Sequence, residues 1–171
     1  MIELVSTLDV KELNIKESDV KGIVSVIRDS IRTCVADHQN NPEAIEQWLA
    51  NKTQSNIKQW MVNNITWIFR QEGQIKGVIL VSPQGEILLN YVAPNSQGQG
   101  IGRALLNQVK RAYLDKGIST LTAESTLTAQ PFYLANGFEC TGNIYEKVAE
   151  SNEANNEGNQ HLVAYKMQIL L

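Results

Sequence analysis

The apolar positions in the first third of the chain follow a helical period. Residues 23–31 carry apolar side chains three, four and seven positions apart, the spacing of an amphipathic helix, and Asp19 stands where it could cap the start of that helix. After a polar break at residues 37–42, residues 43–51 gather their apolar side chains on one side of a second helix. Residues 55–61 repeat this pattern too briefly to define another element. The pattern predicts two short helices ahead of any strand.

Further along, the pattern changes to short strands separated by turns. Strands are predicted at residues 66–70, 75–81 and 86–92, with a glycine in each intervening turn, which indicates an antiparallel meander. A proline ends the meander, and residues 101–114 follow as an amphipathic helix. Residues 119–124 have the composition of a buried strand. The order strand, helix, strand predicts a parallel pair joined by a right-handed crossover.

The last part of the chain is predicted as one short helix and two strands. Residues 130–136 form the helix, which Gly137 closes, and residues 138–142 and 161–171 form the strands. Between these strands, residues 150–159 are polar and acidic and contain no apolar anchor. We expect a mobile loop or a hairpin tip there.

Length and composition narrow the class of protein. A chain of 171 residues fits one domain, residues 1–171, that buries its own core. Hydrophobic residues make up 43% and charged residues 19%, and no apolar run reaches the roughly 18 residues of a membrane span. The N-terminus lacks a basic stretch that leads into an apolar one, so no secretory signal is expected. These features predict a cytoplasmic protein that does not enter a membrane.

The net charge and the spacing of the cysteines and histidines argue against two further classes, namely nucleic-acid-binding proteins and metal-binding proteins. A net charge of −3 lacks the basic surface that phosphate-backbone binding requires, which argues against nucleic acid as a partner. The two cysteines, Cys34 and Cys140, are far apart, and His38 and His161 do not form a metal-ligand pair by spacing. No metal site is therefore expected.

The most informative motif is a glycine-rich loop at residues 97–102, where a strand gives way to a helix. Glycines at 98, 100 and 102 allow the backbone to approach a ligand closely, and the amides of a helix N-terminus attract an anion. On the glycines alone, a flexible turn before a helix is an equal alternative. The context of a dinucleotide-binding loop and the Gly-Lys-Ser/Thr ending of a Walker loop are both absent.

Two segments around this loop resemble a known family. Residues 89–106 resemble the acetyl-CoA signature of the GCN5-related N-acetyltransferases (GNAT), whose pattern Gln/Arg-x-x-Gly-x-Gly/Ala is matched by Gln97, Gly100 and Gly102. Residues 129–138 look like the family's Ala-x-x-Phe-Tyr-x-x-x-Gly-Phe segment. The likeness is clear from about residue 72 to residue 142.

The resemblance implies an α+β fold with a central mixed, mostly antiparallel twisted sheet. About six to seven strands and about four flanking helices are expected from a GNAT-like architecture. The acceptor-side helices would occupy about residues 18–62, the acetyl-CoA core about residues 66–142, and the C-terminal strands about residues 138–171. All of these lie within one acetyltransferase domain.

The same resemblance implies an N-acetyltransferase that uses acetyl-CoA as a co-substrate and needs no metal. A primary amine of a small molecule or a peptide would attack the thioester directly in a ternary complex, which requires a neutral amine, a polarised carbonyl and a proton for the leaving sulfur. An acyl-CoA-binding sensor without turnover is the alternative, and an interaction domain without acetyl-CoA affinity is a third. A homodimer that shares the strand at residues 162–170 is also open.

By this resemblance, two groups of residues would hold acetyl-CoA. The Val92 amide would face the acetyl carbonyl, and the pantetheine arm would pair with the backbone from Tyr91 to Ala93 as an added strand. Ser125 stands near the position at which many relatives carry an asparagine that touches pantetheine. Besides Gln97 of the signature, the pyrophosphate would be held by amides of Gly98, Gln99, Gly100, Ile101 and Gly102, together with Arg103.

The catalytic roles come from the resemblance as well. Tyr133 matches the family tyrosine that protonates the sulfur, and its alternative role is a core aromatic beside Phe132. Glu86 stands before Gln97 at the spacing of the catalytic glutamate in the histone-acetylating subgroup, and its alternative is an exposed carboxylate after a turn. A water relay from Asn90 or Tyr91 would serve in place of a single base. The polar loop that contains His38 is where relatives bind the acceptor, although a loop histidine is usually solvated.

Overall fold

The computed structural model describes residues 1–6, 15–147 and 160–171. A seven-stranded sheet lies at its centre, in the order β1-β2-β3-β4-β5-β7-β6. β4 and β5 run parallel, and the other neighbouring strands are antiparallel. The predicted α+β fold with a mixed, mostly antiparallel sheet is therefore confirmed. The strands are β1 (Ile2–Ser6), β2 (Ile65–Gln71), β3 (Gln74–Val81), β4 (Glu86–Val92), β5 (Thr120–Thr126), β6 (Glu139–Lys147) and β7 (Gln160–Leu170).

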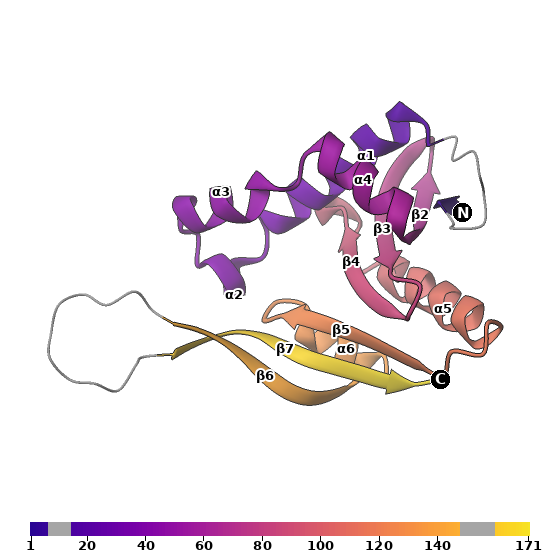
Figure 1. Ribbon diagram of the computed structural model, residues 1–171. Helices are drawn as coiled ribbons and strands as arrows, with labels where there is room; N and C mark the ends of the chain where they lie inside the picture. The colour runs from indigo at the N-terminus through magenta and orange to yellow at the C-terminus, as the bar shows by residue number, and fades with distance from the viewer. Residues whose placement is uncertain (7–14, 148–159) are drawn as a thin grey trace, which may run out of the picture.

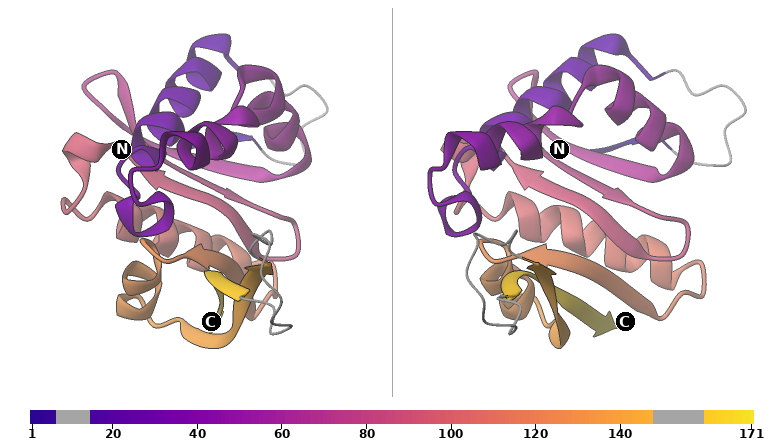
Figure 2. Two further views of the ribbon diagram at one scale, coloured as in Figure 1. Left: turned by 90° about the vertical axis from the view of Figure 1, so that its left-hand side faces the viewer. Right: turned by 60° about the vertical axis from the view of Figure 1, so that its left-hand side comes forward.

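Helices cover both faces of the sheet (Figures 1 and 2). One apolar cluster joins helices α1, α3 and α4 to the face that carries Ile68, Val78 and Leu80. The other joins α5 and α6 to the face that carries Trp67 and Ile79. The two apolar clusters, called the α1 core and the α5 core below, therefore lie on opposite faces of the middle strands. The helices are α1 (Glu17–Ile31), α2 (Val35–His38), α3 (Pro42–Ala50), α4 (Gln54–Asn63), α5 (Ile101–Leu114) and α6 (Gln130–Ala135), with a 3-10 turn η1 (Pro94–Ser96).

The N-terminal third differs from its prediction in three ways. Strand β1 precedes the helices, so the expectation of two helices before any strand was wrong. Its Glu3 carboxylate accepts a hydrogen bond from Arg70 Nε at 3.0 Å, and Arg70 Nη2 donates to Asp19 Oδ1 at 3.0 Å. Asp19 therefore pairs with β2 instead of capping α1, whose N-cap position is Lys16. The short α2 and α4 raise the number of α-helices in the described part above the expected four.

The pairing of β4 with β5 is limited to the first residues of β4. Glu86 lies opposite Thr122 and Ile87 opposite Ala123, and the register records no pair beyond these. Toward its C-terminal end β4 keeps only its partner β3, so the sheet opens between β4 and β5. After the 3-10 turn η1, α5 connects β4 to β5, which confirms the predicted parallel pair joined through a helix.

A bulge in β4 reverses which face each of its later residues occupies. Leu80 pairs with Leu89 and Val81 pairs with Ile87, so Leu88 is an extra residue in the ladder. Ile87 consequently packs in the α5 core, whereas Leu89 packs in the α1 core. By alternation, Asn90 and Val92 share the face of Ile87, and Tyr91 shares the face of Leu89.

Two further expectations from the sequence concern residues 150–159 and membrane-spanning helices. The stretch 150–159, predicted as a mobile loop or hairpin tip, lies outside the described residues. Among the helices that the structure describes, none combines the length and the apolar character needed to cross a membrane.

Thr66 offers a test of the buried face of β2. Its side chain is fully buried, and its Oγ1 has no hydrogen-bond partner within the described part of the chain. Because Thr66→Val removes an unsatisfied buried hydroxyl and keeps the shape, we expect it to raise the free energy of unfolding by about 1 kcal/mol. Urea unfolding measures this, and the exposed Thr122→Val should change it by less than about 0.5 kcal/mol. A loss of stability in Thr66→Val would show that the hydroxyl has a partner.

Candidate functional site

A cavity of about 640 Å³ lies where β4 and β5 part. Its walls come from the end of α1, from α3, from the two parted strands, from the loop before α5 and from α6. This volume is in the range of small-molecule sites. The opening in the sheet therefore leads into a site large enough for a substantial ligand.

The loop between η1 and α5 forms one end of the cavity. Gly98 and Gly100 have φ values of +74° and +80°, a left-handed conformation that side chains rarely adopt. A Cβ added at either position would meet nothing within 4 Å, so the glycines border open space. Gly100 is the N-cap of α5, whose first amides have no partner within the helix. The loop thus presents a row of amides to which an anion can bind.

Two glutamine side chains fasten this loop. Gln97 Nε2 donates to the carbonyl of Val92 at 3.2 Å, and Gln99 Nε2 donates to the carbonyl of Asn95 at 3.2 Å. The first bond ties the loop to the last residue of β4. The position of the loop relative to the parted strand is therefore fixed by Gln97.

The end of β4 turns unpaired backbone toward the cavity. The Ala93 N–H donates to the Lys76 carbonyl at 2.8 Å and so points toward β3. Because amides of successive strand residues point to opposite sides, the Val92 N–H points away from β3, toward the gap. With β5 paired only as far as Ile87, this amide is free to bind an extended ligand, whereas the Val92 carbonyl accepts from Gln97.

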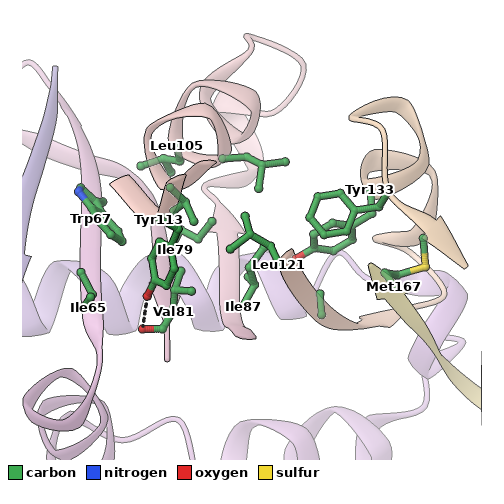
Figure 3. Close-up of a cluster of buried hydrophobic side chains, with 14 of the residues drawn as sticks. Ile65, Trp67, Ile79, Val81, Ile87, Leu105, Tyr113, Leu121, Tyr133 and Met167 are labelled. Atoms are coloured by element: carbon green, nitrogen blue, oxygen red, sulfur yellow. Dashed lines mark hydrogen bonds between the residues drawn. The ribbon is translucent and has the colours of Figure 1, made fainter. Parts of the chain in front are cut away.

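Tyr133 forms the wall from α6. Its ring lies between Phe132 and Phe138, with centroid distances of 5.3 Å and 5.0 Å, at the end of the α5 core shown in Figure 3. Burial raises the pKa of Tyr133 to about 12, and a hydrogen bond with the Asn90 side chain partly offsets that rise. The phenol is therefore protonated at neutral pH and can donate a proton into the cavity.

The wall from α1 and α3 is aromatic and neutral. Tyr91 and Trp48 are partly buried against the α1 core and line the cavity, and a hydrogen bond joins their side chains. Burial raises the pKa of Tyr91 above its usual value and that of the Cys34 thiol to about 11. All three groups are uncharged at neutral pH.

A carboxylate joins this wall to the opposite half of the molecule. Asp37 Oδ1 accepts from the Leu127 N–H at 2.7 Å, and Asp37 Oδ2 accepts from the Thr128 N–H at 3.2 Å. Figures 1 and 2 show α2 reaching from the helical layer to the turn between β5 and α6. Asp37 thereby positions the turn that leads into the helix of Tyr133. Because the partners are about 90 residues apart in sequence, no local pattern reveals this contact.

The buried His38 side chain holds α2 in place through two hydrogen bonds. Its Nδ1 accepts from the Asn40 N–H at 3.0 Å, so the neutral ring donates from Nε2 to the Ile31 carbonyl at 3.0 Å. The side chain is 3% exposed and does not line the cavity. The expectation of a solvated histidine was therefore wrong.

The structure brings most of the predicted site residues to this cavity. Tyr133 lines it, as do all the predicted cofactor residues except Ala93, and Ser125 is buried there with its Oγ donating to the Thr126 carbonyl at 3.0 Å. Glu86 does not line it. That side chain is exposed at the end of β4 away from Val92, which agrees with the alternative of an exposed carboxylate after a turn. Among the described residues, no three metal-ligating side chains gather as a metal site would need.

Comparison with known proteins defines the family. Residues 36–150 match the model of the acetyltransferase (GNAT) domain, which is more than half of the chain. The chain belongs to the GNAT acetyltransferase family. A comparison with curated proteins gives no match.

Solved structures of GNAT proteins share this fold. A GCN5-related N-acetyltransferase from Rhodopseudomonas palustris superposes with a TM-score of 0.77 at 18% identity, over 100% of this chain and 95% of its own. The PaiA N-acetyltransferase from Thermoplasma acidophilum, solved with coenzyme A, gives 0.73 at 17% identity, over 100% and 99%. The ribosomal-protein-alanine N-acetyltransferase from Brucella melitensis gives 0.61 at 20%, over 100% and 99%. At these identities the likeness concerns the fold.

Removing the Asp37 contact provides a test of how the cavity wall is held. We expect Asp37→Ala to lower the free energy of unfolding by about 1 to 3 kcal/mol, because two backbone amides lose a charged acceptor. Hydrogen exchange at the Leu127 and Thr128 amides should accelerate by at least tenfold. Glu46→Ala, an exposed change on α3, should leave both measurements near the wild-type values. Unchanged exchange at Leu127 and Thr128 would mean that Asp37 does not hold the turn.

Proposed function

We propose that this GNAT protein transfers the acetyl group of acetyl-CoA directly to a primary amine within a ternary complex. One observation carries the proposal: a protonated tyrosine hydroxyl, a free strand edge and an anion-binding loop line the same cavity. These are the groups that a direct transfer needs for the leaving sulfur, for the thioester arm and for the pyrophosphate. The family membership and the coenzyme A complex of a structural relative support this reading.

In this proposal, the loop and the first turn of α5 bind the pyrophosphate. The amides from Gly98 to Gly102 point at the phosphates, and the Arg103 guanidinium adds a positive charge. The backbone from Tyr91 to Ala93 pairs with the pantetheine arm, which fills the place that β5 leaves open. Ser125 on β5 borders the same arm from the other side of the gap.

The chemical step is one displacement at the thioester carbon. The Val92 N–H donates to the acetyl oxygen and stabilises the negative charge that develops there. The amine nitrogen forms a bond to the carbonyl carbon, the carbon–sulfur bond breaks, and Tyr133 gives its proton to the sulfur. The proton that the amine loses passes to water next to Asn90 and reaches solvent, and Tyr133 regains a proton from solvent after the products form. Because Glu86 lies outside the cavity, this route replaces a single carboxylate base.

A charge placed in the loop tests the pyrophosphate site. We expect Gly100→Glu to weaken acetyl-CoA binding at least a hundredfold, because it sets a carboxylate and new bulk against the phosphates. Gly73→Glu is a matched control, since Gly73 has a φ of +74°, close to the +80° of Gly100, with nothing within 4 Å of an added Cβ, yet it lies in the β2–β3 turn. Calorimetry measures both affinities. Near-normal binding by Gly100→Glu would remove the loop from the site.

Deleting one hydroxyl tests the proton donor. We expect Tyr133→Phe to lower kcat about a hundredfold or more while the Kd for acetyl-CoA stays the same, because the thiolate then leaves without its proton. Tyr113→Phe is the control: it removes another buried hydroxyl, which donates to the Ser82 carbonyl in the α5 core, and should leave kcat unchanged. Release of free CoA with a panel of amines measures the rates. Acetyl-CoA binding without turnover on any amine would favour a sensor, and no binding would favour an interaction domain.

A further inference from the structure

The cavity is electrostatically polarised along its length. Among the described residues that line it, the charged side chains are Arg103 and Glu124. Arg103 belongs to the first turn of α5, beside the glycine loop. Glu124 lies on β5, across the opening in the sheet. The positive charge therefore marks the pyrophosphate end, and the negative charge stands apart from it.

Glu124 is placed to act on a ligand. It follows Ala123, the last β5 residue paired with β4, so it stands where the two strands have begun to part. Ala123 belongs to the α5 core, and by alternation the Glu124 side chain points to the opposite face of β5, where it is exposed. Lys166 on β7 lies opposite Glu124 in the register but does not line the cavity. Within the described part of the chain, Glu124 makes no ion pair or hydrogen bond.

In the described part of the chain, the neighbouring carboxylates Asp37 and Glu86 do not reach the cavity. Both oxygens of Asp37 accept backbone amides of the β5–α6 turn, and Asp37 is not part of the cavity wall. Glu86 is outside the cavity as well. Of the carboxylates in the described part of the chain, a cationic ligand in the cavity therefore meets only that of Glu124.

The lining that α3, β4 and the end of α1 contribute to the same cavity is apolar and aromatic. Trp48 and Tyr91 present partly buried rings to the cavity, and Cys34 adds a thiol that burial keeps neutral. Such rings bind an aromatic or aliphatic body and tolerate an adjacent cation at their faces. They offer no counter-ion to a second positive charge.

We propose that the acceptor is a primary amine with a single positive charge and an aromatic or aliphatic body. Its amine binds at Glu124 as an ammonium and loses one proton to water before the nitrogen attacks the thioester, and its body packs against Trp48 and Tyr91. A polyamine would bury a second ammonium without a partner, and an amino acid would bring its carboxylate toward Glu124. This inference rests on the proposed function, because it names the substrate class for the same site.

An acceptor panel distinguishes the substrate classes. Release of CoA is measured with phenethylamine, with spermidine and with phenylalanine, whose carboxylate is its only difference in charge from phenethylamine. We expect kcat/KM for phenethylamine to exceed both of the others by at least tenfold. A preference for spermidine or for phenylalanine would overturn the assignment of the acceptor and leave the acetyltransferase proposal intact. No CoA release with any amine would instead contradict the proposed function itself.

The role of Glu124 is then tested by a charge-neutral variant. We expect Glu124→Gln to raise KM for phenethylamine at least tenfold and to leave KM for acetyl-CoA unchanged. The wild-type KM for phenethylamine should rise with added salt, and this salt dependence should be smaller in Glu124→Gln. Glu139→Gln, an exposed change on β6 outside the cavity, should behave as wild type. An unchanged KM for phenethylamine in Glu124→Gln would overturn the proposal.

Discussion

The parting of two parallel strands is the constraint on which the rest of this molecule depends. β4 and β5 pair at Glu86 and Ile87 and then separate, although the sheet continues on both sides. A strand that loses its neighbour leaves amides and carbonyls unpaired, which is costly unless a ligand or water binds them. The cavity, the free edge at Val92 and the position of the glycine loop all follow from this separation.

The bulge at Leu88 determines which side chains of β4 face each side of the opening. If β4 alternated regularly through Leu88, Asn90 would share a face with Glu86; with the bulge, Asn90 faces Tyr133 in the α5 half, and Tyr91 faces Trp48 in the α1 half. One strand thus supplies the two sides of the cavity with different side chains. The proton-donor side and the aromatic side are separated by the thickness of β4.

The sequence predicted those parts of the molecule in which the local pattern is decisive. β4 and α5 have the predicted bounds, because alternation and helical periodicity are clean there and a proline and glycines separate them. β1 was missed, since a five-residue strand that carries Glu3 depends on its pairing with β2 and its ion pair to Arg70. Its stability comes from tertiary contacts and leaves no local period.

The candidate site likewise divides into residues that a local motif reveals and residues that only tertiary contacts place. Gln97, the loop glycines and Tyr133 could be named from motifs, because a ligand-binding loop needs a local sequence. The family's spacing pointed to Glu86, but spacing does not reveal that Glu86 is still paired with β5, before the strands part, and so it could not tell which carboxylate borders the cavity. Glu124 and Asp37 carried no signal, since their positions depend on contacts between distant strands and turns.

An open sheet at the centre of the fold also ties the protein's own integrity to its ligand. A molecule that pairs with the edge of β4 completes a ladder that the chain by itself leaves interrupted, and it does so only in the folded state. Once such a ligand exceeds its Kd, each further tenfold rise in its concentration adds about 1.4 kcal/mol to the free energy of unfolding. The lifetime of the folded protein would then follow the supply of the molecule it uses.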